Sequence, residues 1–294
     1  MPGASPGGAP DIGMKIAVTG AGGFIGRHLV TQLEERGISP TLVIRPGSSM
    51  PEASSRHRVV RMDIADAPPD AYDRLGSPEI LIHLAWGGLP NYSSPHHLDR
   101  ELPAQRSFLT GLLAAGLGGL TVTGTCFEYG MQSGALREDM PTAPVTAYGK
   151  AKDELRRELE RLGRQRPFDF TWARLFYLYG EGQAAGSLLP QLEAAIARGD
   201  AVFDMSGGQQ LRDYLPVEAA AQYLVALALN GRDNGVVNVC SGRPVSVRAL
   251  VEGVVVKHGS SIELNLGRFP YPDHEPMAFW GDGGKLARCF GVDR

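Results

Sequence analysis

The stretch "KIAVTGAGGFIG", residues 15–26, decides the fold of this chain. A short β-type run ends in glycine, and a helical pattern begins shortly after it, which is how a parallel βα unit opens. Gly37 stands in the C-cap position at the end of this pattern. The apolar residues of the helix recur at helical spacing, namely Phe24, Ile25, Leu29 and Leu33. The stretch therefore predicts a strand, a tight turn and a helix.

The glycines of this turn have a spacing that suits a dinucleotide. Gly20, Gly23 and Gly26 fit G-x-x-G-x-x-G, whereas the third glycine of the commoner G-x-G-x-x-G would fall on Ile25. Glycine lets the backbone turn sharply and approach a pyrophosphate, and the helix N-terminus supplies free N–H groups and a partial positive charge. The alternative is a tight turn without a ligand. The position of these three glycines in the first βα unit favours a phosphate-binding loop.

Strand and helix patterns alternate after this turn. A helical stretch covers residues 98–116, and further strand candidates cover residues 41–45, 58–64, 79–85 and 120–125. Such alternation requires right-handed crossovers and a parallel sheet with helices on both faces. We therefore expect an α/β, Rossmann-like, doubly wound parallel sheet with a smaller C-terminal substrate-binding lobe.

The expected division of the chain follows from where this alternation weakens. Residues 1–13, rich in Gly, Pro and Ala, read as a disordered leader. After about residue 175 the pattern loosens, and "PYPDHEP" (270–276) reads as a surface loop. The two lobes, with a cleft between them, are then a cofactor-binding Rossmann domain (14–174 and about 214–242) and a substrate-binding lobe (about 175–213 and 243–294).

The composition argues against several classes of protein. The 294 residues are 43% hydrophobic and 21% charged, with a net charge of -3, as in an ordinary globular protein. This charge gives no reason to expect nucleic acid or an anionic membrane as a partner, and no apolar run is long enough to span a bilayer. Cys126, Cys240 and Cys289 are far apart and form no CxxC pair, which argues against a disulfide framework and a metal site. We expect a cytoplasmic protein.

The end of the second strand bears on the choice of cofactor. A carboxylate there binds the ribose of NAD, whereas an arginine accommodates the 2′-phosphate of NADP. The strand ends "VIRPGSS", with Arg45, Ser48 and Ser49 and no acidic residue. We read this as NADPH, with NADH disfavoured; the alternative is that Arg45 is a solvated strand-end charge. Asp63, near the next strand end, either reaches the adenine region or caps the following segment.

Tyr148 and Lys152 stand at i and i+4 in "YGKAK", before the strongly helical "DELRRELERLG". If the helix already includes Tyr148, the phenol and the ammonium lie on one face, one turn apart. A fixed cation favours the phenolate, and a close, desolvated pair is needed to lower the phenol pKa towards neutrality. Gly163 is expected to end this helix. Alone, such a pair is usually ordinary surface; the glycine loop upstream makes a catalytic role the better reading.

Several motifs occur in a recognisable order: "TGAGGFIG", "HLA" (83–85), "TGTCFEYG" (123–130), "YGKAK", "ARLFYLYGEGQ" and "LRDYLPV". Together they resemble the extended short-chain dehydrogenase/reductase family, especially its members that act on nucleotide-diphosphate sugars. The resemblance covers about residues 14–290. It implies that Tyr148 is the acid/base, that Lys152 holds the nicotinamide ribose and lowers the tyrosine pKa, and that Thr125 hydrogen-bonds the substrate oxygen. No metal is implied.

The resemblance also implies two sets of binding residues. Arg212 in "LRDY" matches an arginine that binds the substrate diphosphate, a role that suits the guanidinium. The expected cofactor-binding residues are Gly20, Gly23, Phe24, Ile25, Gly26, Arg45, Ser48, Asp63, Ile64, Leu84 and Ala85, together with Tyr148 and Lys152. The expected substrate-binding residues are Trp86, Asn91, Tyr92, Cys126, Phe127, Gln183, Ser187, Arg212 and Arg268. For the aromatic loop of residues 86–92, packing on the second lobe is an equal alternative.

"TGTCFEYG" bears on the reaction. Dehydratases of the resembling family have an Asp–Glu pair directly after the threonine, and Cys126 and Phe127 stand there instead. Neither can move protons as that pair does. Glu128, one position later, would face the other side of an extended segment. Dehydration is therefore disfavoured. We interpret Cys126 as a small buried side chain that fills space in the core. We interpret His83 as a residue beneath the cofactor loop whose hydrogen bonds are satisfied within the protein.

One segment departs from the family pattern. Several members carry an arginine in the C-terminal lobe, shortly before an aromatic segment, that binds the substrate diphosphate. Here the segment reads "YPDHEPMAFWGD", without that arginine. Arg268, a few residues upstream, is the candidate to replace it.

These observations favour an NADPH-dependent reductase of the 4-keto group of a nucleotide-diphosphate-4-keto-6-deoxyhexose, as in deoxysugar biosynthesis. An NAD-dependent nucleotide-sugar epimerase of the same family is the alternative, and Arg45 counts against it. A catalytically silent dinucleotide-sensing regulatory protein is a third reading, which the presence of both Tyr148 and Lys152 disfavours. By family analogy a homodimer is expected through helices near residues 98–116 and 148–162.

Overall fold

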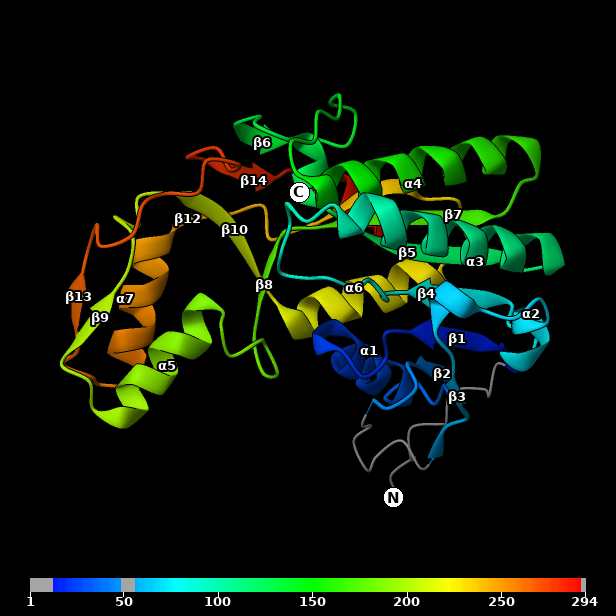
Figure 1. Cartoon of the computed structure of the whole chain (residues 1–294), viewed down its shortest axis with the longest axis horizontal. Helices are drawn as coiled ribbons and strands as arrows, with labels where there is room; N and C mark the ends of the chain where they lie inside the picture. Colours follow the sequence, from blue (N-terminus) through cyan, green and yellow to red (C-terminus); the bar gives the residue numbers. More distant parts are fainter. Residues whose placement is uncertain (1–12, 49–55, 292–294) are drawn as a thin grey trace, which may run out of the picture.

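The computed structural model describes residues 13–48 and 56–291, and a seven-stranded parallel sheet forms its centre (Figure 1). The predicted leader, residues 1–13, lies outside this range except for its last residue. The strand order is β3-β2-β1-β4-β5-β7-β11, which confirms the Rossmann-like prediction. The strands are β1 (Ile16–Thr19), β2 (Thr41–Ile44), β3 (Val59–Arg61), β4 (Ile80–His83), β5 (Gly119–Thr125), β7 (Asp169–Leu175) and β11 (Gly235–Val239).

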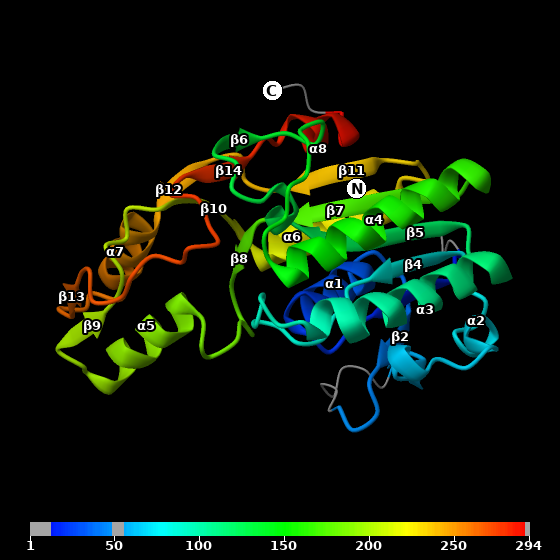
Figure 2. The same cartoon turned by 45° about the horizontal axis from the view of Figure 1, so that its top comes forward.

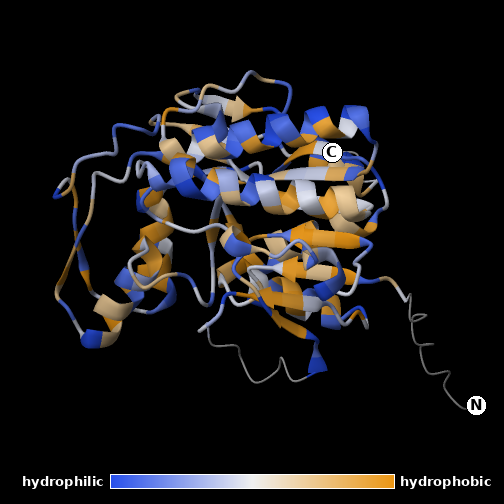
Figure 3. Ribbon diagram, turned by 45° about the vertical axis from the view of Figure 1, so that its right-hand side comes forward, coloured by the Kyte–Doolittle hydropathy of each residue, from blue (hydrophilic) through white to orange (hydrophobic). Residues whose placement is uncertain are grey.

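Helices cover both faces of this sheet (Figure 2). On one face lie α1 (Phe24–Glu34) and α6 (Val217–Leu229), and on the other α2 (Ala71–Arg74), α3 (Leu102–Ala115) and α4 (Ala147–Gln165). Successive strand residues point to opposite faces, so Val18 of β1 joins the core under α1 and α6, whereas Ala17 joins the core under α3 and α4. Figure 3 shows the strands as predominantly hydrophobic, as burial on both faces requires.

A second lobe stands beside the carboxyl ends of the strands (Figure 1). Its small core contains Leu192, Phe203 and Val251. Its three-stranded sheet comprises β8 (Tyr177–Tyr179), β10 (Leu211–Pro216) and β12 (Pro244–Ser246). The remaining elements are the pair β9 (Val202–Asp204) and β13 (Glu263–Asn265), the pair β6 (Gly134–Leu136) and β14 (Phe279–Gly281), and the helices α5 (Leu188–Arg198) and α7 (Val247–Lys257).

Asp213 of β10 ties this lobe to the large sheet. Its buried carboxylate accepts hydrogen bonds from the backbone N–H groups of Ser241, Gly242 and Gly281, at 2.7, 2.9 and 3.2 Å. The last helix, α8 (Gly284–Cys289), packs on β11 of the large sheet. The division into a cofactor-binding and a substrate-binding domain stays a prediction.

Two local predictions are wrong. Helix α4 runs past Gly163 and ends only at Gln165, because Arg166 precedes Pro167 and adopts an extended conformation. Residues 126–129 form a 3₁₀ turn, η4 (Cys126–Tyr129), and not an extended segment. Residues 270–276 form a loop, as predicted, in which His274 and Glu275 are partly buried. In both wrong predictions neighbouring residues decide the outcome: Pro167 follows the end of α4, and Glu128 closes η4 by accepting from the Thr125 N–H.

Candidate active site

The candidate site lies where the parallel strands end, beside the second lobe. Thr19 and His83 are opposite each other at the ends of β1 and β4, and Thr125 ends β5. Ligands of open parallel sheets bind at this edge, near the strands where the chain order reverses. The predicted glycine loop follows Thr19, so the residues predicted to bind the cofactor and those predicted to be catalytic meet at the same edge.

The glycine loop has the geometry of a phosphate cradle. Gly20 has a φ of +70°, and a Cβ there would lie 3.0 Å from the Ala85 backbone nitrogen. A Cβ on Gly26 would collide with the Gly20 carbonyl oxygen. Gly23 is the N-cap of α1 and offers no side-chain cap, so the first N–H groups of the helix, at Phe24 and Ile25, remain free for an anion. These residues fit the pyrophosphate of a dinucleotide.

Two arginines lie at the ends of β2 and β3. Arg45 is exposed directly after β2. Arg61, which sequence reasoning missed, pairs in register with Ile44, and its Nη1 donates to the Ser48 carbonyl oxygen at 3.0 Å. Ser49 lies outside the described residues. Asp63 caps a short 3₁₀ turn, η2 (Ile64–Asp66), by accepting from the Ala65 N–H at 3.0 Å, which is the second of its two predicted roles.

Helix α4 includes Tyr148, so Tyr148 and Lys152 lie one turn apart on one face, as predicted. Thr146 caps the helix by accepting from the Gly149 N–H at 3.1 Å. The Tyr148 N–H donates to the Tyr92 carbonyl oxygen at 2.9 Å. These two bonds fix the start of the helix, and with it the position of the phenol.

Burial controls the protonation of Tyr148 and Lys152. It raises the pKa of Tyr148 well above its ordinary value, together with nearby Tyr92 and Glu128, while hydrogen bonding with Thr125 lowers it. Burial also lowers the pKa of Lys152 to about 7, against the opposing fields of Glu128 and Glu101. Lys152 is not among the largest influences on the Tyr148 pKa. In the chain alone, Tyr148 is therefore a protonated phenol at neutral pH.

Glu128 is buried, and its carboxylate binds several neighbouring groups. Because η4 turns the chain, the carboxylate points inward and accepts from the Thr125 N–H at 2.9 Å, the Trp172 indole at 2.9 Å and Arg174 Nε at 2.7 Å. Its side chain is fully buried. The reason expected for excluding Glu128, an extended segment, was wrong, but the carboxylate is fully committed to these three donors.

Aromatic rings surround Tyr148. The ring centroids of His97, Tyr92, Trp86 and Phe127 lie 5.3, 5.6, 5.8 and 6.5 Å from that of Tyr148. His97 is fully buried on the short π-helical turn η3 (His97–Glu101), and sequence reasoning missed it because nothing in its neighbourhood marks it. Asn91 contributes its carbonyl oxygen to His97 Nε2 at 2.8 Å.

His83 is satisfied beneath the glycine loop. Its Nδ1 lies 2.9 Å from Thr19 Oγ1, and its Nε2 lies 2.6 Å from Gln105 Oε1. Burial lowers its pKa to about 3, and Lys152 adds to this shift. Cys126 is buried, and burial raises the pKa of its thiol. These environments are those expected for a packing histidine and a packing cysteine.

The opposite wall comes from the second lobe. The His274 ring lies 6.1 Å from Phe127 and 6.5 Å from Tyr92, between centroids. Its neighbour Glu275 pairs with Arg212, whose Nη2 lies 2.8 Å from Glu275 Oε2. Arg212 is therefore already paired with an anion inside the protein. Glu275 was not predicted, because only the folded lobe brings residue 275 to residue 212.

Gln183 and Ser187 lie in the segment between β8 and α5. Gln183 Nε2 donates to the Leu178 carbonyl oxygen at 3.1 Å, and Ser187 is the N-cap of α5. This segment contacts α1, since His28 Nε2 lies 2.9 Å from the Glu181 carbonyl oxygen.

Arg268 is elsewhere in the lobe. Its guanidinium is exposed and lies 3.8 Å from an Asp204 oxygen at the end of β9. Its role as a diphosphate ligand stays a prediction, and the structure shows no contact between Arg268 and the residues around Tyr148.

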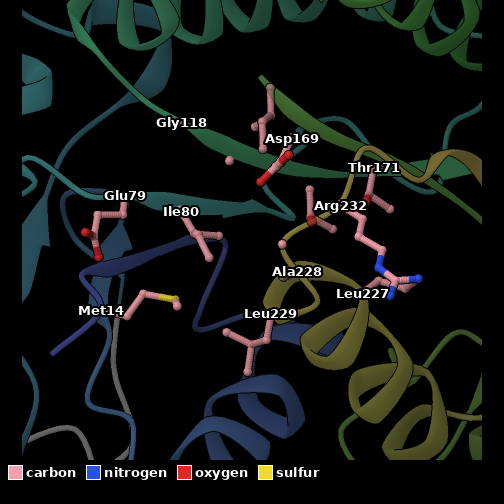
Figure 4. A pocket seen from close by; sticks show the side chains of 14 residues that line it. Met14, Glu79, Ile80, Gly118, Asp169, Thr171, Leu227, Ala228, Leu229 and Arg232 are labelled. Atoms are coloured by element: carbon pink, nitrogen blue, oxygen red, sulfur yellow. The ribbon is translucent and has the colours of Figure 1, made fainter. Parts of the chain in front are cut away.

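The opposite edge of the sheet carries a separate hollow of about 320 Å³ (Figure 4). It lies where β4, β5 and β7 begin, and its charged residues are Glu79, Asp169 and Arg232. None of the predicted site residues lines it. Across residues 13–48 and 56–291, no cluster of three or more His, Cys, Asp or Glu is arranged to hold a metal ion. No helix in the same ranges is long and apolar enough to cross a membrane.

Comparison with known proteins identifies the family. A model of the NAD dependent epimerase/dehydratase family matches residues 16–240. A dTDP-6-deoxy-L-talose 4-dehydrogenase (NAD(+)) from Aggregatibacter actinomycetemcomitans is 28% identical over 270 residues, covering 91% of this chain and 99% of the relative. A dTDP-6-deoxy-L-talose 4-dehydrogenase (NAD(P)(+)) from Kitasatospora kifunensis is 28% identical over 269 residues, covering 88% and 83%.

A solved structure agrees with these relatives. MoeE5 in complex with UDP-glucuronic acid and NAD superposes with a TM-score of 0.80 at 26% identity, covering 95% of this chain and 93% of that one. The matched region contains the glycine loop, the Thr125–Tyr148–Lys152 set and the strand order of the sheet. The chain therefore belongs to the NAD dependent epimerase/dehydratase family of nucleotide-sugar-modifying enzymes.

Proposed function

We propose that this enzyme interconverts the 4-keto and 4-hydroxy forms of a nucleotide-diphosphate-6-deoxyhexose, working as an NADPH-dependent 4-ketoreductase. The observation that carries this proposal is the site itself: Thr125, Tyr148 and Lys152 are assembled, while Cys126 and Phe127 occupy the two positions where an elimination pair would stand. With a hydride supplied by a nicotinamide, a hydroxyl, a phenol and an ammonium suffice for carbonyl reduction, whereas they do not suffice for dehydration.

The names of the relatives support this reaction. Two of them are 6-deoxy-talose 4-dehydrogenases. A 4-dehydrogenase oxidises a C4 hydroxyl to a ketone, and the same site run in reverse reduces that ketone. A 4-dehydrogenase and a 4-ketoreductase thus catalyse the same redox reaction in opposite directions. Cofactor supply and the free energy of the substrate decide the direction.

Tyr148 acts as the proton donor in reduction. Burial keeps its phenol protonated at neutral pH, which is the form that a donor needs. Thr125 is the last residue of β5, beside Tyr148, and its hydroxyl polarises the sugar carbonyl oxygen. Lys152 holds the nicotinamide ribose and steadies the phenolate after proton transfer. A nicotinamide bound on the glycine loop supplies the hydride.

We also propose NADP(H) as the preferred cofactor. Arg45 and Arg61 lie at the ends of neighbouring strands, where the adenosine ribose binds in this fold. A doubly negative 2′-phosphate between two guanidiniums is favoured by charge and geometry. The two relatives are named for NAD(+) and for NAD(P)(+), so the strand ends of this chain, and not the family, carry this proposal.

A homodimer in the cytoplasm completes the proposal. The exposed side of α4 carries charges of both signs, namely Lys150, Glu154, Arg157 and Arg161, which can pair across a two-fold axis. Light scattering on the purified chain measures this state directly. All three cysteines are free thiols, which suits a reducing compartment.

The test of the reaction follows reduced nicotinamide by absorbance and fluorescence. In a reduction arm, purified protein is given dTDP-4-keto-6-deoxyglucose with NADPH or NADH. In a separate oxidation arm it is given dTDP-6-deoxy-L-talose, whose C4 ketone is a different stereoisomer, with NADP⁺ or NAD⁺. Turnover in either arm with the 2′-phosphorylated cofactor preferred supports the proposal. Absence of turnover in both arms, with NAD retained through purification, would replace it by the epimerase alternative.

A further inference from the structure

The ammonium of Lys152 lies in an unusual environment. The side chain is 1% exposed, and Nζ donates to the Thr123 carbonyl oxygen at 2.8 Å. Glu128 and Glu101 favour its charge through space, and neither forms a hydrogen bond with it. A buried ammonium held by a single carbonyl would readily lose its proton. A further stabilising group is needed if the charged form is to persist at neutral pH.

That group is the indole of Trp86. Lys152 Nζ lies 4.0 Å from the Trp86 ring centroid, compared with 6.0 Å from the centroids of Tyr148 and Trp172. Tryptophan is the strongest aromatic partner for a cation, and the interaction strengthens when the cation is desolvated. The position of the indole therefore decides where the ammonium rests and how readily it is deprotonated.

His97 holds the edge of the Trp86 indole in place. The Trp86 Nε1–H donates to His97 Nδ1 at 3.1 Å, so Nδ1 carries no proton. The other nitrogen, Nε2, then donates to the Asn91 carbonyl oxygen at 2.8 Å. With both nitrogens used and no exposure, His97 has one tautomer and one orientation. The indole cannot turn away from Lys152 without breaking a buried hydrogen bond.

We propose that Trp86, held by His97, is a positioning residue for Lys152: its indole face keeps the ammonium charged and fixed beside Tyr148. The inference uses the proposed role of Lys152 but does not depend on the identity of the substrate. It explains why a bulky aromatic residue follows the "HLA" motif, a position for which the sequence predicted sugar binding or packing on the second lobe.

The other elements packed around Lys152 do not supply this effect. His83 of β4 supplies no charge, because burial and the nearby Lys152 lower its pKa to about 3 and leave the imidazole neutral. Tyr148 of α4 and Trp172 of β7 are neutral and more distant. Glu101 of η3 is engaged by the Gly87 N–H, Gln105 and His96, and Glu128 of η4 by the three donors already described.

The test is a pH titration of the Lys152 side chain in the protein without substrate. The chain has five lysines, so side-chain NMR of labelled lysine gives a small set of signals, and the Lys152→Met variant assigns the relevant one. Trp86→Leu should lower the titration midpoint by about one pH unit, and Trp86→Phe by clearly less, because phenylalanine keeps an aromatic face. Trp280→Phe, in β14, is the control and should leave the midpoint unchanged.

Indole fluorescence provides a second readout that leaves Trp86 in place. With Trp172 and Trp280 changed to Phe, the emission of Trp86 should show a pH step that disappears in the Lys152→Met background. An unchanged Lys152 midpoint in a folded Trp86→Leu variant would overturn the proposal, as would a fluorescence step that survives Lys152→Met. Neither measurement involves turnover, so failure here is distinct from a wrong substrate assignment.

Discussion

Glu275 neutralises Arg212 inside the second lobe. Glu275 Oε2 lies 2.8 Å from Arg212 Nη2 and 3.2 Å from Nε, and Arg212 is only 1% exposed. The remaining guanidinium nitrogen, Nη1, donates to the Leu211 and Met277 carbonyl oxygens. A substrate diphosphate that used Arg212, as family resemblance implies, must therefore displace Glu275 or share the guanidinium with it.

Glu275→Gln should lower the stability of the protein and raise its affinity for the substrate diphosphate. The change leaves a buried guanidinium without its counter-ion and should lower the free energy of unfolding by about 2–4 kcal/mol. It also removes the competitor for a diphosphate, so dTDP should bind about tenfold more tightly or better. Urea unfolding and the shift of the thermal midpoint with added dTDP measure the two effects.

The matched control is Glu252→Gln, which removes a half-exposed partner of Arg248 and should change stability by less than about 0.5 kcal/mol. If Glu275→Gln binds dTDP no better than the original chain, Arg212 serves the fold and the diphosphate is bound elsewhere.

Tyr148→Phe should reduce turnover by about 10²–10⁴-fold, because the proton donor is removed while the ring is kept. NADPH binding, followed by fluorescence, should remain near normal. Thr125→Val should lose about 10²–10³-fold through the missing hydroxyl, whereas Thr125→Ser keeps both that hydroxyl and the cap on η4 and should retain most activity. Near-normal turnover of Tyr148→Phe would exclude Tyr148 as the donor.

Arg45→Asp should reverse the cofactor preference. The new carboxylate repels a 2′-phosphate and can accept from a ribose hydroxyl, so the ratio of kcat/KM for NADPH over NADH should fall by about 10–100-fold. Arg232→Asp makes the same charge change at the opposite edge of the sheet and should leave the ratio unchanged. Equal ratios in the two variants would mean that Arg45 is a solvated strand-end charge.

Local spacing predicted the parts of this site that one segment builds. The glycine loop and the Tyr148–Lys152 pair each lie within a single βα turn or helical turn, so sequence was sufficient to place them. The interactions of Glu128 with Arg174 and of Glu275 with Arg212 join residues 46 and 63 positions apart, and no local pattern encodes them. Arg61 was missed for the same reason: its place beside Ser48 depends on the pairing of β2 with β3.

The stability of the protein should depend on pH through Lys152. Burial lowers its folded-state pKa to about 7, whereas a lysine in the unfolded chain titrates near 10.4. Below pH 7 both states carry the proton, and folding bears the full cost of burying an ammonium. Between about pH 7 and 10 only the unfolded state keeps the proton, so the free energy of unfolding rises with pH.

Lys152→Met removes that cost. It should raise the free energy of unfolding by about 2–4 kcal/mol below pH 7, and the gain should shrink towards zero near pH 10, because the buried lysine is by then neutral. Lys150→Met, on the exposed side of the same helix, is the matched control and should change stability little at any pH. Urea unfolding of the three proteins between pH 6 and about 10 gives the comparison. A Lys152→Met gain that does not vary with pH would show that the ammonium is not destabilised by burial, and that Trp86 and the surrounding carboxylates together offset its desolvation.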